Sequence, residues 1–195
     1  MIKLLSVYNE EDNKILTSPS RLVNGNDWND WTIKLIISTM KEFSTKYPNS
    51  IWFSAIQLWY PTQLFYINLR STEAFNIKTE FESFIINPVI KRKSEETFDW
   101  YEWCMSIADQ DWIPTNRRKV KRSVEIIFDY IDEFGILHDD CKLSWFAAVV
   151  FQHEYDHIMG KLINETWYDI ISPEKYQIKK EYWEIGRAHV WTPVT

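Results

Sequence analysis

The chain is short of glycine, cysteine and long apolar runs. It has 4 glycines in 195 residues, whereas an average usage of about 7% predicts roughly 14. Its two cysteines, Cys104 and Cys141, lack the spacing of a disulfide framework, which favours a reducing compartment. No apolar run approaches the roughly 20 residues of a membrane-spanning helix, and the first residues lack the apolar core of a signal peptide. We therefore expect a cytoplasmic protein with no membrane partner.

The balance of charge and size narrows the class further. A net charge of −6 gives no bulk attraction for nucleic acid, so no DNA partner is expected. With 45% hydrophobic residues the chain can form one core, and we expect one domain over residues 1–183 and a monomer. The tail 184–195, EIGRAHVWTPVT, resembles a sequencing-library adapter translated in frame, with Trp191 at a TGA codon. We expect this tail to be non-native.

Hydrophobic periodicity predicts an α+β fold. Apolar residues recur at helical spacing over 27–46 and 144–161, and Ser172 with Pro173 is typical of a further helix start. Between the first two helices the pattern changes to short β-rich runs, and residues 118–143 predict two strands joined near Gly135. We therefore expect mainly antiparallel strands packed around a central helix, 144–161.

The segment QHEYDH within this helix carries the strongest chemical signal. His153 and His157 are four residues apart, so on a helix both imidazoles project from one face and can bind a single metal ion. Glu154 is adjacent and can take a proton from a water molecule that the metal activates. Cys104 is a candidate third ligand because thiolates bind divalent metals well, and Asp156 is a candidate to orient a ligand histidine. The alternative is a polar helix face with two solvated histidines.

Three motifs, in order along the chain, resemble the peptide deformylase family. That family has G-x-G-x-A-A-x-Q, then E-G-C-L-S, then Q-H-E-x-D-H-x-x-G. This chain has SIWFSAIQ at 50–57, EWCMS at 102–106 and QHEYDHIMG at 152–160, and IINPVI, KSEET and KVKRS also resemble the family. The resemblance implies a deformylase fold carrying the His-Glu-x-x-His helix.

The resemblance also implies roles for individual residues. Cys104, His153 and His157 would hold one divalent metal ion, typically Fe²⁺, with Zn²⁺, Ni²⁺ or Co²⁺ as alternatives. Glu154 would be the general base and then the proton donor. Gln57 and the backbone N–H of Met105 would stabilise the oxyanion. Residues expected at the substrate are Ile51, Trp52, Trp103 and Val150.

The implied reaction is removal of the formyl group from the N-terminal formyl-methionine of nascent polypeptides, with release of formate. The partner would be the nascent chain. A transient ribosome contact through the lysines at 175, 179 and 180 is a weaker expectation. An iron–thiolate centre would be sensitive to oxygen.

The sequence also departs from the family pattern. Trp52 and Trp103 stand where the family has glycine, and Ser50 replaces a third glycine. The family arginine about a dozen residues beyond the cysteine is not found, since Asn116 falls near that place with Arg117 one step on.

The excess of tryptophan offers an explanation. The family pattern also favours glycine at Trp59, Trp100 and Trp145, and the 11 tryptophans nearly match the glycine deficit. Some bacterial lineages read UGA as glycine, so our hypothesis is that many of these tryptophans are glycine codons translated with the wrong table. The alternative is a lineage that reads UGA as tryptophan and has a divergent enzyme.

Two other functions fit parts of the sequence. A zincin-type metalloprotease shares His-Glu-x-x-His but takes its third ligand downstream, for which Glu174 or Glu181 could be proposed. That alternative leaves EWCMS unexplained. A deformylase-like, metal-binding protein without turnover would have its cleft filled by Trp52 and Trp103.

Overall fold

A computed structural model of the chain describes residues 3–48, 50–69, 81–107, 117–172 and 175. Its strands form two sheets in which every pair is antiparallel. The five-stranded sheet has the order β1 (Trp52–Ser54), β2 (Leu64–Asn68), β3 (Glu82–Lys93), β6 (Glu125–Ile131) and β7 (Leu137–Ser144). The three-stranded sheet has the order β4 (Thr97–Glu102), β5 (Arg117–Ser123) and β8 (Asp169–Ile171).

Five α-helices and two short 3₁₀ turns lie in the described ranges. They are α1 (Glu10–Leu16), α2 (Gly25–Asn29), α3 (Thr32–Lys46), η1 (Ala55–Leu58), η3 (Met105–Ile107), α4 (Phe146–Ile158) and α5 (Ile163–Thr166). None of these helices is long and apolar enough to cross a membrane.

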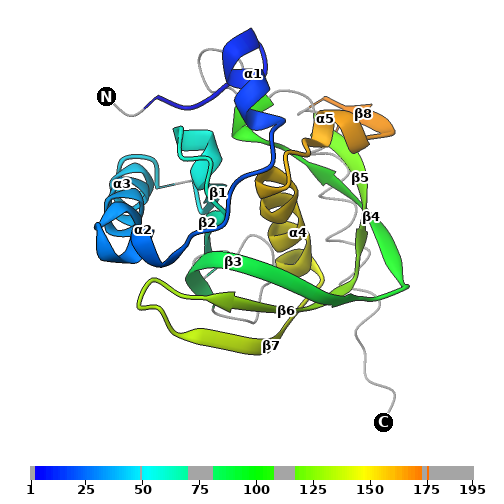
Figure 1. Cartoon of the computed structure of the whole chain (residues 1–195). Helices are drawn as coiled ribbons and strands as arrows, with labels where there is room; N and C mark the ends of the chain where they lie inside the picture. The colour runs from blue at the N-terminus through cyan, green and yellow to red at the C-terminus, as the bar shows by residue number, and fades with distance from the viewer. Residues whose placement is uncertain (1–2, 49, 70–80, 108–116, 173–174, 176–195) are drawn as a thin grey trace.

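Helix α4 lies between the two sheets, as Figure 1 shows. It contacts β1, β2 and β7 on one side and β5 on the other. Its buried Phe151 packs on Phe65 and Phe128, with ring centroids 5.2 and 4.1 Å away. Because ten of its thirteen residues are buried, α4 is held from both sides, and any polar group on it must find a partner inside the protein.

A second apolar cluster holds α3 against the edge of the larger sheet. The buried residues of α3 follow the predicted three- and four-residue spacing and pack on β1, β2 and β3. They are Ile33, Ile36, Ile37, Met40 and Phe43. This cluster includes Phe53 and Ala55, so it anchors the β1–η1 segment that leads to Gln57.

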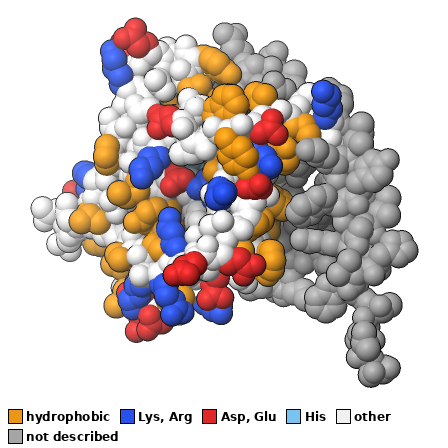
Figure 2. Space-filling model, turned by 90° about the vertical axis from the view of Figure 1, so that its right-hand side faces the viewer, with side chains coloured by type: hydrophobic (Ala, Val, Ile, Leu, Met, Phe, Trp, Pro, Cys, Tyr) orange, Lys and Arg blue, Asp and Glu red, His pale blue; other side chains and the backbone are white. Residues whose placement is uncertain are grey.

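The three-stranded sheet, β4, β5 and β8, lies on the other side of α4 from the larger sheet, and part of this side of the molecule is seen in Figure 2. There, basic and acidic side chains are interspersed with apolar ones over the described atoms. Lys119 on β5, for example, pairs with Asp99 on β4 at 3.3 Å and lies over the ring of Tyr168 at 5.1 Å. The mixture of signs matches the modest net charge of the chain.

The predicted antiparallel α+β architecture is confirmed, with three differences in its elements. The helix expected over 27–46 is divided into α2 and α3, because Trp31 adopts a left-handed backbone (φ 69°). Residues 118–143, expected to form two strands, contribute to three, β5, β6 and β7, because the chain leaves β5 and changes sheet at Val124. Of the helix expected from Ser172, the structure describes Ser172 and Lys175, whose N–H donates to the Ser172 hydroxyl at 3.4 Å, while its other residues and the tail 184–195 lie outside the described residues.

Three tryptophans have backbone conformations that glycine normally adopts. Among described residues other than glycine, five have positive φ: Trp31, Trp59, Asn87, Asp140 and Trp145. Asparagine and aspartate are enriched there, whereas a bulky residue is an outlier. Trp59 (φ 72°) ends η1 at a position typical of a glycine cap. Trp145 (φ 54°, ψ −128°) has the angles of the glycine position in a type II′ turn.

These angles support the glycine hypothesis at some positions and leave it open at others. Trp59 and Trp145 are in the set that the sequence singled out, and Trp31 is an addition. Trp52 and Trp100 lie in strands, and neither they nor Trp103 have positive φ. At those three positions the backbone alone does not require glycine.

We expect Trp145→Gly to give a more stable protein than Trp145→Ala, by about 1–2 kcal/mol in the free energy of unfolding. Both changes remove the exposed indole and its contact with Phe98. The difference between them is therefore the strain of a Cβ at this φ. Urea denaturation measures it, and an alanine variant as stable as the glycine variant would contradict the assignment.

Candidate metal centre and active site

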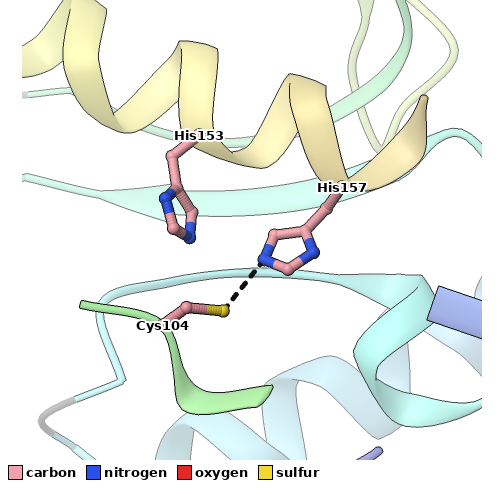
Figure 3. A group of neighbouring side chains, drawn as sticks. All are labelled: Cys104, His153 and His157. Atoms are coloured by element: carbon pink, nitrogen blue, oxygen red, sulfur yellow. Dashed lines mark hydrogen bonds between the residues drawn. The ribbon is translucent and has the colours of Figure 1, made fainter. Parts of the chain in front are cut away.

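Three potential metal ligands converge between α4 and the segment that follows β4. His153 and His157 project from the same face of α4, and Cys104 faces them, as Figure 3 shows. The three ligand atoms lie within 4.8 Å of one another, and Cys104 Sγ is 3.2 Å from His157 Nε2. All three side chains are buried, so the group is shielded from bulk water. The structure thus brings together the three residues proposed from the sequence.

This donor set fits a divalent transition-metal ion. One sulfur and two imidazole nitrogens suit zinc or ferrous iron, and three protein ligands leave one position open for a reacting molecule. Cys104 is a free thiol, whereas the other free thiol, Cys141, lies on β7. The His157 Nδ1 atom has no hydrogen-bond partner among the described residues, and burial lowers the pKa of His157 well below 6.5. A neutral imidazole is the form that binds a metal.

A buried ion-pair network orients His153. Glu102 Oε2 lies 2.7 Å from His153 Nδ1, and the same carboxylate is paired with Arg122 at 2.6 and 2.8 Å. Because Nδ1 donates to a carboxylate, the Nε2 atom is left as the metal-binding nitrogen. Arg122 also binds Asp156 on α4. The guanidinium therefore ties β4, β5 and α4 together around the metal centre.

Arg122 is a residue of the site that the sequence did not single out. Asn116 lies outside the described residues and Arg117 pairs in β5 with Ile171, whereas Arg122 makes the buried bidentate pair with Glu102. Arg122 lies further along the chain from Cys104 than the place of the family arginine, where Asn116 stands. The resemblance of KVKRS to the family was the signal that could have found it. Asp156, predicted to orient a ligand histidine, has no direct contact of this kind with His153. It binds Arg122, which binds Glu102, and Glu102 in turn binds His153.

Glu102 is ionised despite its burial. Burial alone would raise its pKa, but the Coulombic attraction and hydrogen bonds of Arg122, with the hydrogen bond to His153, outweigh it and lower the pKa from 4.5 to about 2. A carboxylate whose pKa is lowered on folding stabilises the folded protein at pH values above the pKa that the group has in the unfolded chain. This contribution is lost as the pH falls through the pKa that the group has in the folded protein.

Glu102→Gln therefore predicts a specific change in acid stability. The free energy of unfolding of the metal-free wild type should exceed that of the variant by about 3 kcal/mol at pH 7. The difference should begin to fall below pH 4.5 and be nearly gone at about 2, the unfolded and folded pKa values of Glu102. Free energies of unfolding measured from pH 7 down to the acid transition check this. A difference that stays constant over that range would show that Glu102 is not ionised in the folded protein.

Glu154 lies beside the ligands with its carboxylate shielded from solvent. Its Oε1 atom is 4.0 Å from His153 Nε2, and its Oε2 atom accepts a hydrogen bond from Ser54 Oγ at 2.8 Å. Burial raises the pKa of Glu154 to about 7. A carboxyl group with a pKa near neutral can both accept and return a proton, which suits a general base that later acts as an acid.

The Gln57 side chain is held beside Cys104 by three contacts. Its Oε1 atom accepts from the Ser54 N–H at 2.9 Å, so its Nε2 atom faces Ser106 Oγ at 3.0 Å and Cys104 Sγ at 3.7 Å. The amide has two hydrogens, and the one directed at the sulfur is available for a substrate oxygen. Met105 begins η3 directly after Cys104, and N–H groups in the first turn of a helix have no partner within that helix.

The cavity at this centre is small. Its volume is about 40 Å³, roughly three water molecules at about 10–15 Å³ each. The predicted residues at its walls are Ile51, Trp52, Gln57, Trp103, Cys104, Met105, His153 and Glu154. Trp52 packs edge-on against Phe146, and the Trp103 indole nitrogen is buried with no hydrogen-bond partner in the described part of the chain. Val150, also predicted at the substrate, belongs to α4, packs in the apolar core and does not line this cavity.

Comparison with known proteins identifies the family. A family model described as polypeptide deformylase matches residues 4–173. Peptide deformylase 2 of Nostoc sp. is 30% identical over 152 residues, 76% of this chain and 80% of the relative. The peptide deformylase of Rickettsia akari is 32% identical over 111 residues, 56% of this chain and 59% of the relative. The chain spans about half the length of the first curated relatives it matches.

Solved structures show the same fold at low sequence identity. A class I type b peptide deformylase of Acinetobacter baumannii with bound Met-Ala-Ser has a TM-score of 0.70 at 22% identity, covering 85% of this chain and 98% of that one. A probable peptide deformylase of a Synechococcus phage has a TM-score of 0.67 at 23% identity, covering 86% and 100%. With the family model matching most of the sequence, these similarities lead to one conclusion: the chain belongs to the peptide deformylase family.

Proposed function

We propose that the protein is a metal-dependent hydrolase that removes the N-formyl group from the formyl-methionine of nascent polypeptides and releases formate. The observation that carries the proposal is the buried Cys104–His153–His157 group with Glu154 beside it and Gln57 opposite. This is the set that the resemblance assigns to the reaction, and the family match adds independent support. The Met-Ala-Ser bound to the Acinetobacter relative fits a peptide substrate.

The residues would divide the reaction between them. Cys104, His153 and His157 would hold the ion, proposed as Fe²⁺ with Zn²⁺, Ni²⁺ or Co²⁺ as substitutes. The ion would supply Lewis acidity and lower the pKa of a water molecule towards neutrality. Glu154 would take a proton from the attacking water and return it to the leaving amine, which a pKa of about 7 favours. The Gln57 amide and the Met105 N–H would donate to the oxygen that becomes negatively charged.

The setting of the enzyme follows from the substrate. Formylated chains emerge in the cytoplasm, so we place the protein there, acting as a monomer on nascent chains. The proposed domain, residues 1–183, contains the segment matched by the family model. Of the three lysines considered for a ribosome contact, those at 179 and 180 lie outside the described residues. The same holds for Glu174 and Glu181, the ligands that a zincin-type protease would require.

A second candidate function is supported by the small cavity. A formyl-methionine residue has many more heavy atoms than the roughly three water molecules that this space holds. With Trp52 and Trp103 both present, the chain would be a metal-binding protein with impaired turnover.

Formate release from formyl-Met-Ala-Ser tests both candidates. The protein is loaded anaerobically with Fe²⁺, or with Co²⁺ so that sulfur-to-metal charge transfer reports the Cys104 ligand. Acetyl-Met-Ala-Ser is the matched control, because its acyl group is larger by one methyl. Formate and free Met-Ala-Ser from the formyl peptide, without acetate or free Met-Ala-Ser from the acetyl peptide, support a deformylase. A bound metal without formate, in the chain as written and with Trp52 and Trp103 replaced by glycine, would overturn the proposed activity.

A further inference from the structure

Ser54 joins the proposed general base to the proposed oxyanion donor. It is the last residue of β1 and precedes η1, and its side chain is inaccessible to solvent. Its hydroxyl donates to Glu154 Oε2 at 2.8 Å, a contact between residues 100 positions apart. The family pattern quoted above has alanine at this place, so the pattern gives this hydroxyl no role.

The same oxygen also accepts a hydrogen bond. The N–H of Gln57 donates to Ser54 Oγ, and the Gln57 side chain accepts from the Ser54 N–H in return. This reciprocal arrangement is a capping box, which fixes the start of a helical turn. Because Gln57 Oε1 is occupied, its Nε2 atom is directed at Ser106 and Cys104. The orientation of the Gln57 amide therefore depends on the backbone N–H of Ser54, and the Ser54 hydroxyl helps to fix that backbone as the other half of the capping box.

The direction of each hydrogen bond limits where Glu154 can point. A serine hydroxyl has one proton, and here it is committed to Glu154 Oε2 while the oxygen accepts from Gln57. The other carboxylate oxygen, Oε1, is the one nearer His153 Nε2. Ser54 thus holds one oxygen of Glu154 and leaves the other facing the ligand group. In a buried site an unheld carboxylate would sample other rotamers.

We infer that Ser54 is a positioning residue that keeps Glu154 and Gln57 in a fixed relation on opposite sides of the reacting group. The inference rests on the proposed function. It assigns to Ser54 no contact with substrate, only the orientation of two groups that make such contacts. A misplacement of about 1 Å at such groups can cost about 10²-fold in rate, so the orientation has kinetic consequences.

Ser54→Ala tests the inference, with Ser20→Ala as the matched control. Ser20 is also buried, and its hydroxyl has no hydrogen-bond partner in the described ranges. Activity is measured in the chain as written or in the Trp52→Gly/Trp103→Gly variant, whichever turns over faster. We expect Ser54→Ala to lower kcat about tenfold with KM changed less than about twofold, because substrate binding is intact and the groups that Ser54 positions act on the reacting atoms. Ser20→Ala should change neither constant.

A second measurement uses the metal-free protein and does not depend on turnover. In a double-mutant cycle of Ser54→Ala with Glu154→Ala, the effects on the unfolding equilibrium constant should deviate from additivity by about fivefold, because each change alone removes the hydrogen bond that the two side chains share. Additive effects, or an unchanged kcat in Ser54→Ala beside an active wild type, would overturn the role of Ser54. No formate from the wild type or the glycine variant would instead overturn the proposed function, and this role with it.

Discussion

Replacing Glu154 by glutamine is expected to lower kcat by about 10²–10⁴-fold while the metal stays bound. Glutamine keeps the shape and the hydrogen bond from Ser54 but cannot accept a proton from water. Since Glu154 is not one of the three converging ligand residues, its loss should not release the ion. The effect should therefore fall on kcat and leave the cobalt charge-transfer band unchanged.

Two controls make this result specific. Glu165→Gln changes an exposed glutamate on α5 and should leave kcat as in the wild type. Cys104→Ser should remove the charge-transfer band, since that band requires a sulfur ligand. A Glu154→Gln protein that retains metal and turns over within tenfold of the wild type would show that another group is the base.

The second large effect is expected from opening the cavity. Replacing both Trp52 and Trp103 by glycine should raise kcat/KM for formyl-Met-Ala-Ser by about 10- to 100-fold. Forcing a substrate into a filled space costs about 1–3 kcal/mol, and each 1.4 kcal/mol is about tenfold. The Trp103 indole N–H is buried without a hydrogen-bond partner among the described residues. Such a group lowers the stability of the folded protein by about 1–3 kcal/mol, and replacing Trp103 removes it.

The matched control is Trp31→Gly, the same change of residue outside the cavity. Trp31 is exposed at the start of α3 and has positive φ. This variant should gain stability through relief of backbone strain without a change in kcat/KM. If the double glycine variant were no faster than Trp31→Gly, the indoles would not be what limits access to the metal centre.

The glycine hypothesis has a direct chemical test besides these variants. Peptide masses from the native protein distinguish glycine from tryptophan at each position, and the codons of the gene with its tRNA set give the same answer. Tryptophan mass at 52 and 103 would establish a protein with a closed centre. Glycine mass there and at 31, 59 and 145 would explain both the motif departures and the three strained backbones.

The parts of the site that follow from local pattern were predictable. His153 and His157 are four residues apart on one helix, so their shared face follows from helical geometry, and Glu154 is the next residue after His153. Cys104 and Gln57 were placed by their motifs, and the structure brings them to the same centre. The division of the first long helix at Trp31 was missed because no local signal marks a tryptophan as a residue of left-handed backbone.

The polar contacts that support the site were not predictable in the same way. Arg122 was overlooked because its distance from Cys104 along the chain says little about its distance in space. The hydroxyl of Ser54 gave no signal because its partner is 100 residues away. Val150 was expected near the substrate from the family resemblance, but its side chain packs in the core with Phe65 and Phe151.

The amino-acid sequence by itself determined the elements of this protein, its family and the residue types that can bind a metal. These depend on periodicity and on motifs, which are properties of neighbours in the chain. Only the tertiary structure decided that Arg122 neutralises Glu102, that Ser54 joins Glu154 to Gln57, and that Trp52 and Trp103 leave so little space at the centre. Such contacts arise when the two sheets close on α4, because burial forces each polar group to find whichever partner the packing brings within reach.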